Sequence, residues 1–404
     1  PMTPARASSG IFGLACLLTT AGLSYPAAAQ PEFEHRGEIS AEISWYPRKL
    51  AYRGQKGSFL HLEARPEIFV YGDSIEAQIQ PRISGGTAGG GLVDFREANI
   101  TGRAGEMDYL IGNTVLFWGQ VESYNPVDIV NAKDFSRGLL RSEKRGAPMA
   151  KLSWPAGAGQ LDLLAVDFVE NVYPDTSLRE RPGLQVTGNK PGFSNGADSD
   201  DIATAVRWAG YFGDVDLGVS WFRGTGHAPR LVPQADGTLK PDYSRITQSG
   251  LDIQYLRGDT ALKGEAIRRR GQYDRLGNIG SYSAWIAGVE HNLYDVDGNG
   301  RDLVLIAEYA RDSRRGTAHS GFQNDLTLGG RWVWNDVEDT ELLALVSRDL
   351  DNDAQTMTLT FDRRLTDSLT FEASARRVER LDRDSNSVAL ARDEAVIAKL
   401  TYSF

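Results

Sequence analysis

The stretch EAVIAKLTYSF, residues 394–404, alternates between apolar and polar side chains almost without a break. Successive side chains of an extended strand point to opposite faces, so this stretch would present two different surfaces. One face carries Val396, Ala398, Leu400, Tyr402 and Phe404. The other carries Ile397, Lys399, Thr401 and Ser403. The first face suits hydrocarbon and the second mostly suits water, which is typical of a strand in the wall of a membrane barrel.

The same period of two recurs along the chain and predicts about 18 strands, with 16 as the main rival number. Each is long enough to cross a bilayer as a tilted strand. We expect strands over 37–46, 58–70, 74–83, 93–103, 106–118, 148–155, 159–169, 202–211, 214–223, 246–257, 260–269, 282–294, 302–311, 325–335, 340–349, 355–364, 367–377 and 394–404.

The connections between these strands alternate in length. Short ones such as YFGD, RGDT and RLTDS take turns with longer polar segments, and only DLDND breaks the alternation. The long segments are 47–57, 84–92, 119–147, 170–201, 224–245, 270–281, 312–324 and 378–393. The sequence therefore predicts an all-β fold: a transmembrane, antiparallel, up-and-down β-barrel with short periplasmic turns and long extracellular loops.

The rest of the composition agrees with a barrel. A basic Arg6, an apolar run over 11–23 and small residues near Ala29 predict a signal peptide over 1–29, which leaves 30–404 for the barrel. No apolar run reaches the 18 residues that a membrane-spanning helix needs. The only cysteine, Cys16, falls in the predicted signal peptide, so the barrel region has neither a disulfide nor a thiolate site.

The charge balance bears on the partners. The chain has 44 Lys and Arg against 54 Asp and Glu, a formal net charge of −10. A nucleic-acid partner would need a basic surface, so we expect none.

The tryptophans fall within or at the ends of the predicted strands, mostly on the apolar face, and predict an aromatic girdle at the membrane interface. They are Trp45, Trp118, Trp154, Trp208, Trp221, Trp285, Trp332 and Trp334.

A longer stretch carries a resemblance to known proteins. REANITGRAGEMDYLIGNTVLFWGQVESYNPVDIVNAKDF, residues 96–135, contains Trp118-Gly119 followed by Asn125-Pro126-Val127-Asp128. This resembles a proteobacterial outer-membrane, porin-like barrel family of unknown function, related in style to the alginate-export porins. The resemblance implies a channel in the outer membrane of a Gram-negative bacterium. It names no substrate.

The segment 119–147 is the candidate constriction loop. Asn125 could cap a short helical turn with Pro126 in its first position. If the loop folds into the lumen, it brings charged groups to the pore; if it does not, it forms an outer lid or packs on the rim. The residues that we assign to this loop are Trp118, Asn125, Pro126, Asp128, Asp134, Lys144 and Arg145.

Charged side chains on the wet strand faces form a second candidate site. They could select and orient polar solutes, or they could pair with one another and only stiffen the wall. The predicted pore-lining residues are Glu63, Arg65, Glu76, Arg82, Glu97, Lys263, Glu265, Glu308, Arg331, Glu372, Arg376 and Lys399. Both signs occur, so no preference for anions or cations follows.

Other motifs favour simpler interpretations. DVDGNGRDL begins like a calcium loop with Asp295, Asp297 and Asn299, but the twelfth position is Ile306 in place of a bidentate Glu, so we expect a periplasmic turn. The five histidines show no metal-ligand spacing. We therefore expect no metal, no cofactor and no catalytic residue.

The function that these observations favour is passive diffusion of small polar solutes through a charged lumen narrowed by the 119–147 loop. An exopolysaccharide export channel and, in another class, an outer-membrane hydrolase stay open. The expected partners are outer-membrane lipid and lipopolysaccharide, the small polar solute, and a second copy of the chain in a possible homo-oligomer. The outer-membrane assembly machinery is a further partner, for which Leu400, Tyr402 and Phe404 form the predicted recognition signal.

Overall fold

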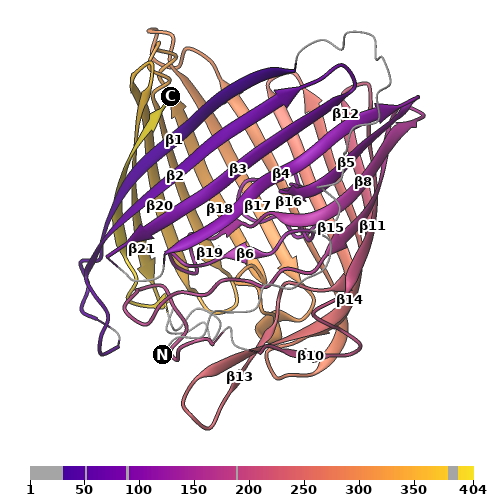
Figure 1. The fold of residues 1–404 in the computed structure, drawn as a ribbon. Helices are drawn as coiled ribbons and strands as arrows, with labels where there is room; N and C mark the ends of the chain where they lie inside the picture. The colour runs from indigo at the N-terminus through magenta and orange to yellow at the C-terminus, as the bar shows by residue number, and fades with distance from the viewer. Residues whose placement is uncertain (1–30, 51, 88–90, 188–189, 381–389) are drawn as a thin grey trace.

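The computed structural model of the protein describes residues 31–50, 52–87, 91–187, 190–380 and 390–404. The predicted signal peptide over 1–29 lies outside the described residues. Almost all regular structure in the described part of the chain is β-strand (Figure 1). None of the helices in these residues is long and apolar enough to cross a membrane.

The main sheet contains 20 strands, of which the short β10 (Gly192–Ser194) and β13 (Arg230–Pro233) attach to an extension of β14. The other 18 form the wall. They are β1 (Glu32–Trp45), β2 (Ser58–Tyr71), β3 (Ile75–Gly86), β4 (Leu92–Ala104), β5 (Met107–Thr114), β8 (Ala147–Ala156), β9 (Gly159–Asp167), β11 (Ile202–Phe212), β12 (Val215–Thr225), β14 (Leu239–Arg257), β15 (Thr260–Tyr273), β16 (Ile279–Leu293), β17 (Asp302–Asp312), β18 (Asn324–Val333), β19 (Glu341–Asp349), β20 (Gln355–Thr366), β21 (Leu369–Glu379) and β22 (Ala395–Ser403).

The last wall strand closes the sheet onto the first. β22 pairs with β1 in antiparallel register from Glu38↔Ser403 to Trp45↔Val396. Beyond that ladder, the backbone of Gly37 exchanges two hydrogen bonds with Phe404, at 2.9 and 3.0 Å. Every wall strand is thus paired on both sides, which removes the free edges that a sheet in hydrocarbon cannot tolerate. The predicted antiparallel up-and-down barrel of 18 strands is confirmed.

The apolar side chains of the wall point outward. In β1, Ile39 and Ile43 are 53 % and 59 % exposed, whereas Glu42 and Ser44 between and beside them are 6 % and 2 % exposed. A water-soluble protein has the opposite arrangement, because burial of apolar area is its main driving force. The outer surface is therefore a lipid-facing band, and the closed barrel has the architecture of an integral outer-membrane protein.

The connections sort by length, as the sequence predicts. Short turns share one end of the barrel with Phe404, and the long connections gather at the other end, the lower one in Figure 1. Two predicted loops are shorter in the structure. The predicted 84–92 is reduced to 87–91 between β3 and β4, and the predicted 270–281 is reduced to 274–278 between β15 and β16. β14 also begins seven residues before the predicted 246, since its first residues pair with β10 and β13.

One tryptophan does not belong to the girdle. The predicted strand over 106–118 ends at Thr114, because the N–H of Val115 donates to Glu97 (3.0 Å) and the N–H of Leu116 donates to Asn131 (2.8 Å) in place of a strand partner. Trp118 is consequently part of a loop and is only 5 % exposed, inside the barrel. Its assignment to the membrane interface was wrong. Trp45, Trp221 and Trp285 do face outward, at 53 %, 37 % and 39 % exposure.

Candidate pore and its internal loop

The connection between β5 and β8, residues 115–146, enters the barrel. It carries the two-stranded hairpin of β6 (Lys133–Asp134) and β7 (Glu143–Lys144), and β6 lies within the outline of the barrel in Figure 1. Near the start of the loop, Asn125 and Pro126 form a single turn closed by a hydrogen bond from the Asp128 N–H to the Asn125 carbonyl oxygen (3.3 Å). The expected helical turn does not form, because no further hydrogen bond of that kind follows.

The first half of the loop packs against an apolar part of the inner wall. Val127 and Val130, 0 % and 1 % exposed, belong to the largest hydrophobic cluster of the described residues. Their wall partners include Phe222 of β12 and Ile246 of β14, both 1 % exposed. The part of the inner face that these residues form, between β8 and β16, is therefore not a wet lumen wall. Burial of its apolar area fixes the loop to this side of the barrel.

Two wall carboxylates hold the backbone of the same half of the loop. Glu265 of β15, 3 % exposed, accepts hydrogen bonds from the N–H groups of Gln120 (2.7 Å), Val121 (3.4 Å) and Val127 (3.4 Å). Glu308 of β17, also 3 % exposed, accepts from the N–H groups of the next turn, residues 122 (2.7 Å) and 123 (2.9 Å). Charge-assisted bonds of this kind are the stronger hydrogen bonds in proteins.

Arginines on the opposite wall hold the second half of the loop. Arg82 of β3 is 1 % exposed and lies 2.8 Å from a carboxylate oxygen of Asp94 and 2.8 Å from one of Asp134 in the loop. Arg65 of β2 lies 2.5 Å from Glu143 in the loop. β2 and β3 lie about half-way around the barrel from β15, so the loop spans the interior from wall to wall.

The loop also supplies arginines of its own. Arg141 lies 2.5 Å from Glu42 of β1, and Arg137 lies 3.2 Å from the same carboxylate and also pairs with Glu143. Burial opposes the charge of Arg141, but the neighbouring Glu180 and Glu42 outweigh that effect and raise the pKa of its guanidinium. Sequence reasoning missed these partners, because residues 137 and 141 fell in a long loop without any pattern.

Open space lies along the remaining wall, beside the loop. One cavity of about 700 Å³ runs between the loop and strands β18 to β20. A second cavity of about 380 Å³ shares Leu140, Ser142, Glu143, Thr358 and Arg376 with it and continues towards β1 and β22. The loop therefore narrows the interior without filling it.

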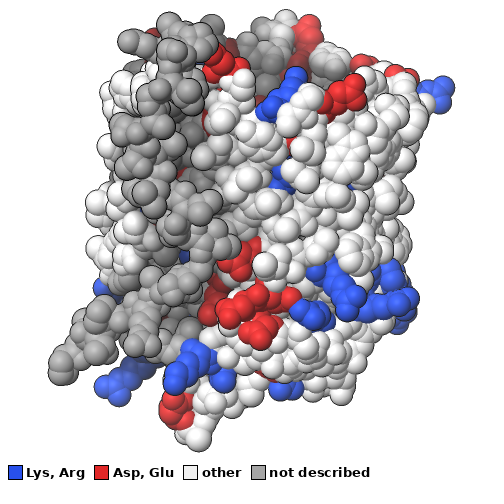
Figure 2. Space-filling model, turned by 45° about the vertical axis from the view of Figure 1, so that its right-hand side comes forward, with Lys and Arg blue, Asp and Glu red and all other residues white. Residues whose placement is uncertain are grey.

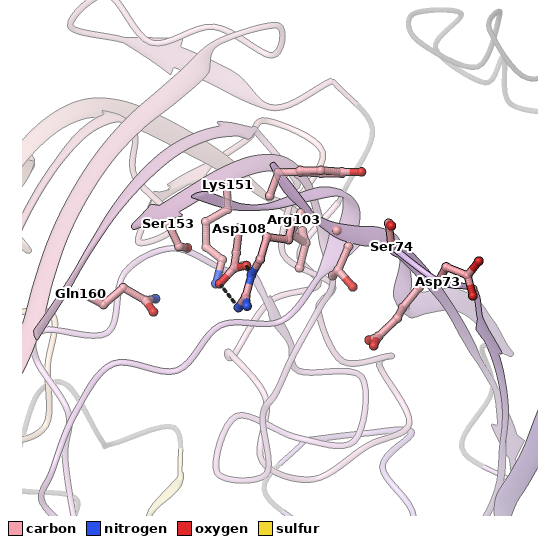
Figure 3. Close-up of a pocket in the computed structure, with 13 residues that line it drawn as sticks. Asp73, Ser74, Arg103, Asp108, Lys151, Ser153 and Gln160 are labelled. Carbon is pink, nitrogen blue, oxygen red and sulfur yellow. Dashed lines mark hydrogen bonds and ion pairs between the residues drawn. The ribbon is translucent and has the colours of Figure 1, made fainter. Parts of the chain in front are cut away.

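A third space, of about 640 Å³, opens at the short-turn end (Figure 3). Its lining comes from β3, β4, β5, β8 and β9 and includes Lys151, Ser153 and Gln160. Within it, the guanidinium of Arg103 lies 2.6 Å from Asp108. Glu76, one of the predicted pore-lining residues, faces the same space.

The predicted lumen charges occupy three kinds of position. Glu372, Arg376 and Lys399 line the open cavity beside the loop. Lys263 pairs with Glu290 at 2.5 Å, and Arg331 lies 3.3 Å from Glu122 of the loop. Five others contact the loop and attach it to the wall: Arg65, Arg82, Glu97, Glu265 and Glu308. Glu63 pairs with Arg65 of its own strand at 2.5 Å.

The predicted loop residues also divide. Asn125, Asp128 and Lys144 face the 700 Å³ cavity. Lys144 lies 2.5 Å from Asp128 and 4.6 Å from the ring centroid of Phe117; burial lowers the pKa of Lys144 and raises the pKa of Asp128. Trp118 and Asp134 are buried, and Arg145 donates to the Glu170 carbonyl oxygen, so these three hold the loop in place.

A cluster of charges without solvent contact joins the long loops at the outer end. Arg179, 0 % exposed, lies 2.8 Å from Asp393, whose second oxygen accepts a hydrogen bond from the Glu180 N–H at 2.7 Å. Glu180, also 0 % exposed, accepts from the Tyr46 hydroxyl at 2.8 Å. The sequence offered no signal for this cluster, because its members come from three separate loops.

The possible metal-binding groups of the chain include the calcium-like turn at Asp295 and Asp297. No group of three or more His, Cys, Asp or Glu within the described ranges could hold a metal ion. In the calcium-like turn, Asp295 accepts a hydrogen bond from the Gly300 N–H (2.6 Å) and Asp297 accepts one from the Asn299 N–H (3.0 Å). These carboxylates satisfy the backbone of their own turn.

His227 connects the loop system to the wall. It follows β12, its ring stacks on Phe168 with centroids 5.3 Å apart, and its Nε2 donates to the Val130 carbonyl oxygen at 3.1 Å. Its Nδ1 is buried. Burial lowers the pKa of His227 to about 4, because a charged imidazole would lose its solvation there.

We expect acid to destabilise the barrel through His227. The folded pKa of about 4 lies below the unfolded value of about 6.5, so this contribution to stability is complete above pH 6.5 and is lost as the pH falls towards 4. At pH 5 the loss from this group is about 2 kcal/mol. The measurement is the denaturant midpoint of the folded protein near pH 7.5 and near pH 5.

The variant His227→Phe is the control for this prediction. It keeps a ring against Phe168 but does not titrate, so its midpoint should fall less between the two pH values. His319, with a pKa that burial also lowers to about 4, contributes equally to both proteins. An identical acid loss in His227→Phe and the parent would contradict the prediction.

Comparison with known proteins adds information on the fold. No protein-family model and no curated protein matches this sequence. Among solved structures, Wzi of Escherichia coli, an outer membrane protein involved in group 1 capsule assembly and described as a carbohydrate-binding β-barrel, matches with a TM-score of 0.50 at 12 % identity, over 91 % of this chain and 84 % of that chain.

Two porin structures match less well. OmpF of Salmonella typhi has a TM-score of 0.46 at 8 % identity, over 92 % of this chain and 97 % of that chain. A mutant of Rh. blastica porin has a TM-score of 0.46 at 11 % identity, over 92 % of this chain and 100 % of that chain. The similarity to Wzi shows that this chain has the fold of an outer-membrane β-barrel.

Proposed function

We propose that this protein is an outer-membrane channel through which small polar solutes diffuse passively. The observation that carries the proposal is the 700 Å³ cavity beside the internal loop, which continues into the second cavity along β20 to β22. A barrel that served only as an anchor would have no need for open space past a loop that is attached to both walls. The proposed mechanism needs neither a cofactor nor turnover.

The lining of this path suits hydrogen-bonding solutes. Its wall side carries a series of hydroxyl groups from four neighbouring strands: Thr327, Ser347, Thr356, Thr358, Thr360 and Ser374. Hydroxyls both donate and accept hydrogen bonds, so they can replace part of the water shell of a polar solute. Its loop side carries the Lys144–Asp128 pair and Ser142.

Charges on the two sides of the loop would add a transverse field. Carboxylates at Glu265 and Glu308 stand on one wall, and Arg65 and Arg82 stand on the other. The two arginines are paired with carboxylates and the two carboxylates accept hydrogen bonds from the loop backbone, so we expect a weak ionic preference together with an orienting effect on dipolar solutes.

The test is single-channel recording in planar bilayers. We expect the purified full chain to produce discrete conductance steps, with a reversal potential close to zero in a salt gradient because acidic and basic groups both line the path. Liposome swelling should show that small neutral sugars also enter. A barrel that inserts into the bilayer, as shown by protection of its strands from protease, but passes neither ions nor sugars would overturn the proposal.

A second candidate is passage of a saccharide chain. Tyr124 of the loop and Phe322 of the β17–β18 connection stack with centroids 5.0 Å apart and both face the 700 Å³ cavity. The flat apolar faces of sugar rings pack well on aromatic rings. Wzi, whose fold is similar, is described as carbohydrate-binding. Export of a polysaccharide would use the same path.

Current block by oligosaccharides distinguishes the two candidates. If a saccharide chain is the natural solute, neutral oligosaccharides should interrupt the single-channel current, and Tyr124→Ala should weaken this block while leaving the conductance steps in place. If short sugars pass and longer ones neither enter nor block, the small-solute proposal is favoured.

A further inference from the structure

Three arginines point outward near the long-loop end of the barrel. They are Arg223 of β12 and Arg268 and Arg270 of β15, and all three are exposed. The intervening Arg269 is 8 % exposed and faces inward, as the alternation of a strand requires. An outward arginine lies on the face that meets lipid, where a charge is costly unless it reaches the interface or finds a partner.

The strand register brings the three side chains together. Arg223 is paired with Thr247 of β14, which is paired with Arg270 on its other side. Two residues further along β14, towards the middle of the barrel, Ser249 is paired with Arg268. Strands lie about 4.8 Å apart, so Arg223 and Arg270 are separated by about 10 Å at the backbone, with hydroxyl groups between them.

These arginines have no carboxylate partner in the described part of the chain. The one polar side-chain contact of the three is from Arg268 to the Ser283 hydroxyl, at 3.1 Å. Two other outward arginines at the same end are paired with carboxylates: Arg348 lies 2.5 Å from Asp353, and Arg377 lies 2.6 Å from Glu379. Three neighbouring cations repel one another, so this patch is suited to an anion from outside the chain.

The patch lies at the level of the membrane interface. Trp221 and Trp285, both outward, flank Arg268, and outward tryptophans mark the boundary between hydrocarbon and headgroups. Figure 2 shows basic side chains gathered low on the outer face, beside a patch of acidic side chains at the same level and under a broad white surface. Long loops are extracellular in such barrels, so this boundary belongs to the outer leaflet.

We propose that Arg223, Arg268 and Arg270 bind the phosphate groups of an outer-leaflet glycolipid, the lipid A part of lipopolysaccharide. Guanidinium groups match phosphate oxygens in a bidentate way and are weakly hydrated, and the hydroxyls of Thr247 and Ser249 can add hydrogen bonds. The acyl chains would lie along the apolar wall below. This site is separate from the channel and does not depend on its function.

The test is binding of three probes to the purified full chain in neutral detergent: diphosphorylated lipid A, the same lipid without phosphates, and inorganic phosphate. We expect the diphosphorylated lipid to bind about tenfold or more tightly than the dephosphorylated lipid, which corresponds to about 1.4 kcal/mol. In the triple variant R223Q/R268Q/R270Q this difference should disappear. Native mass spectrometry of the protein–lipid complex is the readout.

The matched control is the double variant R348Q/R377Q, which removes two outward arginines that are already paired and should keep the difference. Each arginine of the patch is exposed, so its replacement should not prevent folding. The comparison of the two lipids also uses the unchanged protein, so it can be made even if a variant folds poorly. Equal binding of both lipids would overturn the proposal. The proposal would also be overturned if inorganic phosphate displaced the diphosphorylated lipid at the same concentration as that lipid. It would likewise be overturned if the triple variant kept its preference for the diphosphorylated lipid and differed from the parent mainly in oligomeric state.

Discussion

Replacing Glu265 and Glu308 together by alanine is expected to release the internal loop and to make the single-channel current larger and noisier. The two carboxylates accept five hydrogen bonds from loop N–H groups, and both are nearly buried. Each N–H that loses its acceptor without reaching water costs about 1–3 kcal/mol. A total loss of only about 3 kcal/mol would increase the fraction of released loop roughly a hundredfold.

Two measurements check this expectation. Single-channel recordings should show higher and more variable conductance than the parent, and protease added from the loop side should cut within 119–147. The isosteric pair Glu265→Gln and Glu308→Gln should give a smaller effect, because each amide keeps one acceptor oxygen. Since the apolar contacts of Val127 and Val130 remain, the barrel itself should stay folded.

The control is Glu290→Ala. Glu290 is also a carboxylate on the inner wall, but it pairs with Lys263 of the wall and not with the loop. Its loss removes one carboxylate, where the double variant removes two, and it does not touch the loop. If the double variant alters the current by no more than twice the effect of Glu290→Ala, charge rather than loop release is the cause, and the attachment role of Glu265 and Glu308 is refuted.

Replacing Asp393 by asparagine is expected to destabilise the outer end of the barrel by about 3–5 kcal/mol, since it leaves the charge of Arg179 buried without its counter-ion. Arg179 is 0 % exposed and lies 2.8 Å from Asp393. The same carboxylate accepts the Glu180 N–H at 2.7 Å, so the contact between two long loops weakens as well. The midpoint of denaturant unfolding and protease cleavage in the long loops are the measurements.

Two further variants make this prediction specific. Asp353→Asn removes a carboxylate at the same end whose pairs with Arg348 and Arg380 are about half exposed, and it should have little effect because water screens such pairs. Arg179→Met combined with Asp393→Leu removes both partners of this pair and should recover part of the stability, since neither charge of the pair is left buried alone. If Asp393→Asn and Asp353→Asn shift the midpoint equally, the buried pair has no special role.

The barrel itself could be predicted because its determinants are local. Each of the 18 predicted strands overlaps one wall strand, and the alternation in 394–404 and 37–46 anticipated which side chains of β22 and β1 face lipid. Strand faces repeat every two residues, so a short window is enough to read them. Boundaries were less accurate, as at Thr114 and Leu239, because distant side chains and added strands decide where a ladder ends.

The interior could be predicted only in part. The sequence indicated that Glu265, Glu308 and Arg82 turn away from lipid, but it could not indicate that they hold a loop rather than line free space. Inward apolar residues such as Phe222 and Ile246 looked like ordinary strand positions, yet they form the surface on which the loop packs. Arg137 and Arg141 were missed because loop residues carry no periodic signal.

By itself, the sequence of this protein determined that its strands alternate between a lipid-facing and an inward-facing side and that long connections collect at one end. Only the tertiary structure decided that residues 115–146 cross the barrel, that the loop packs on apolar residues of one wall and leaves open space beside β18 to β20, and that the outward arginines of β12 and β15 meet. The reason is physical. Strand direction depends on neighbours one and two positions away, whereas these contacts join residues up to about two hundred positions apart, whose partners are set by barrel closure and register.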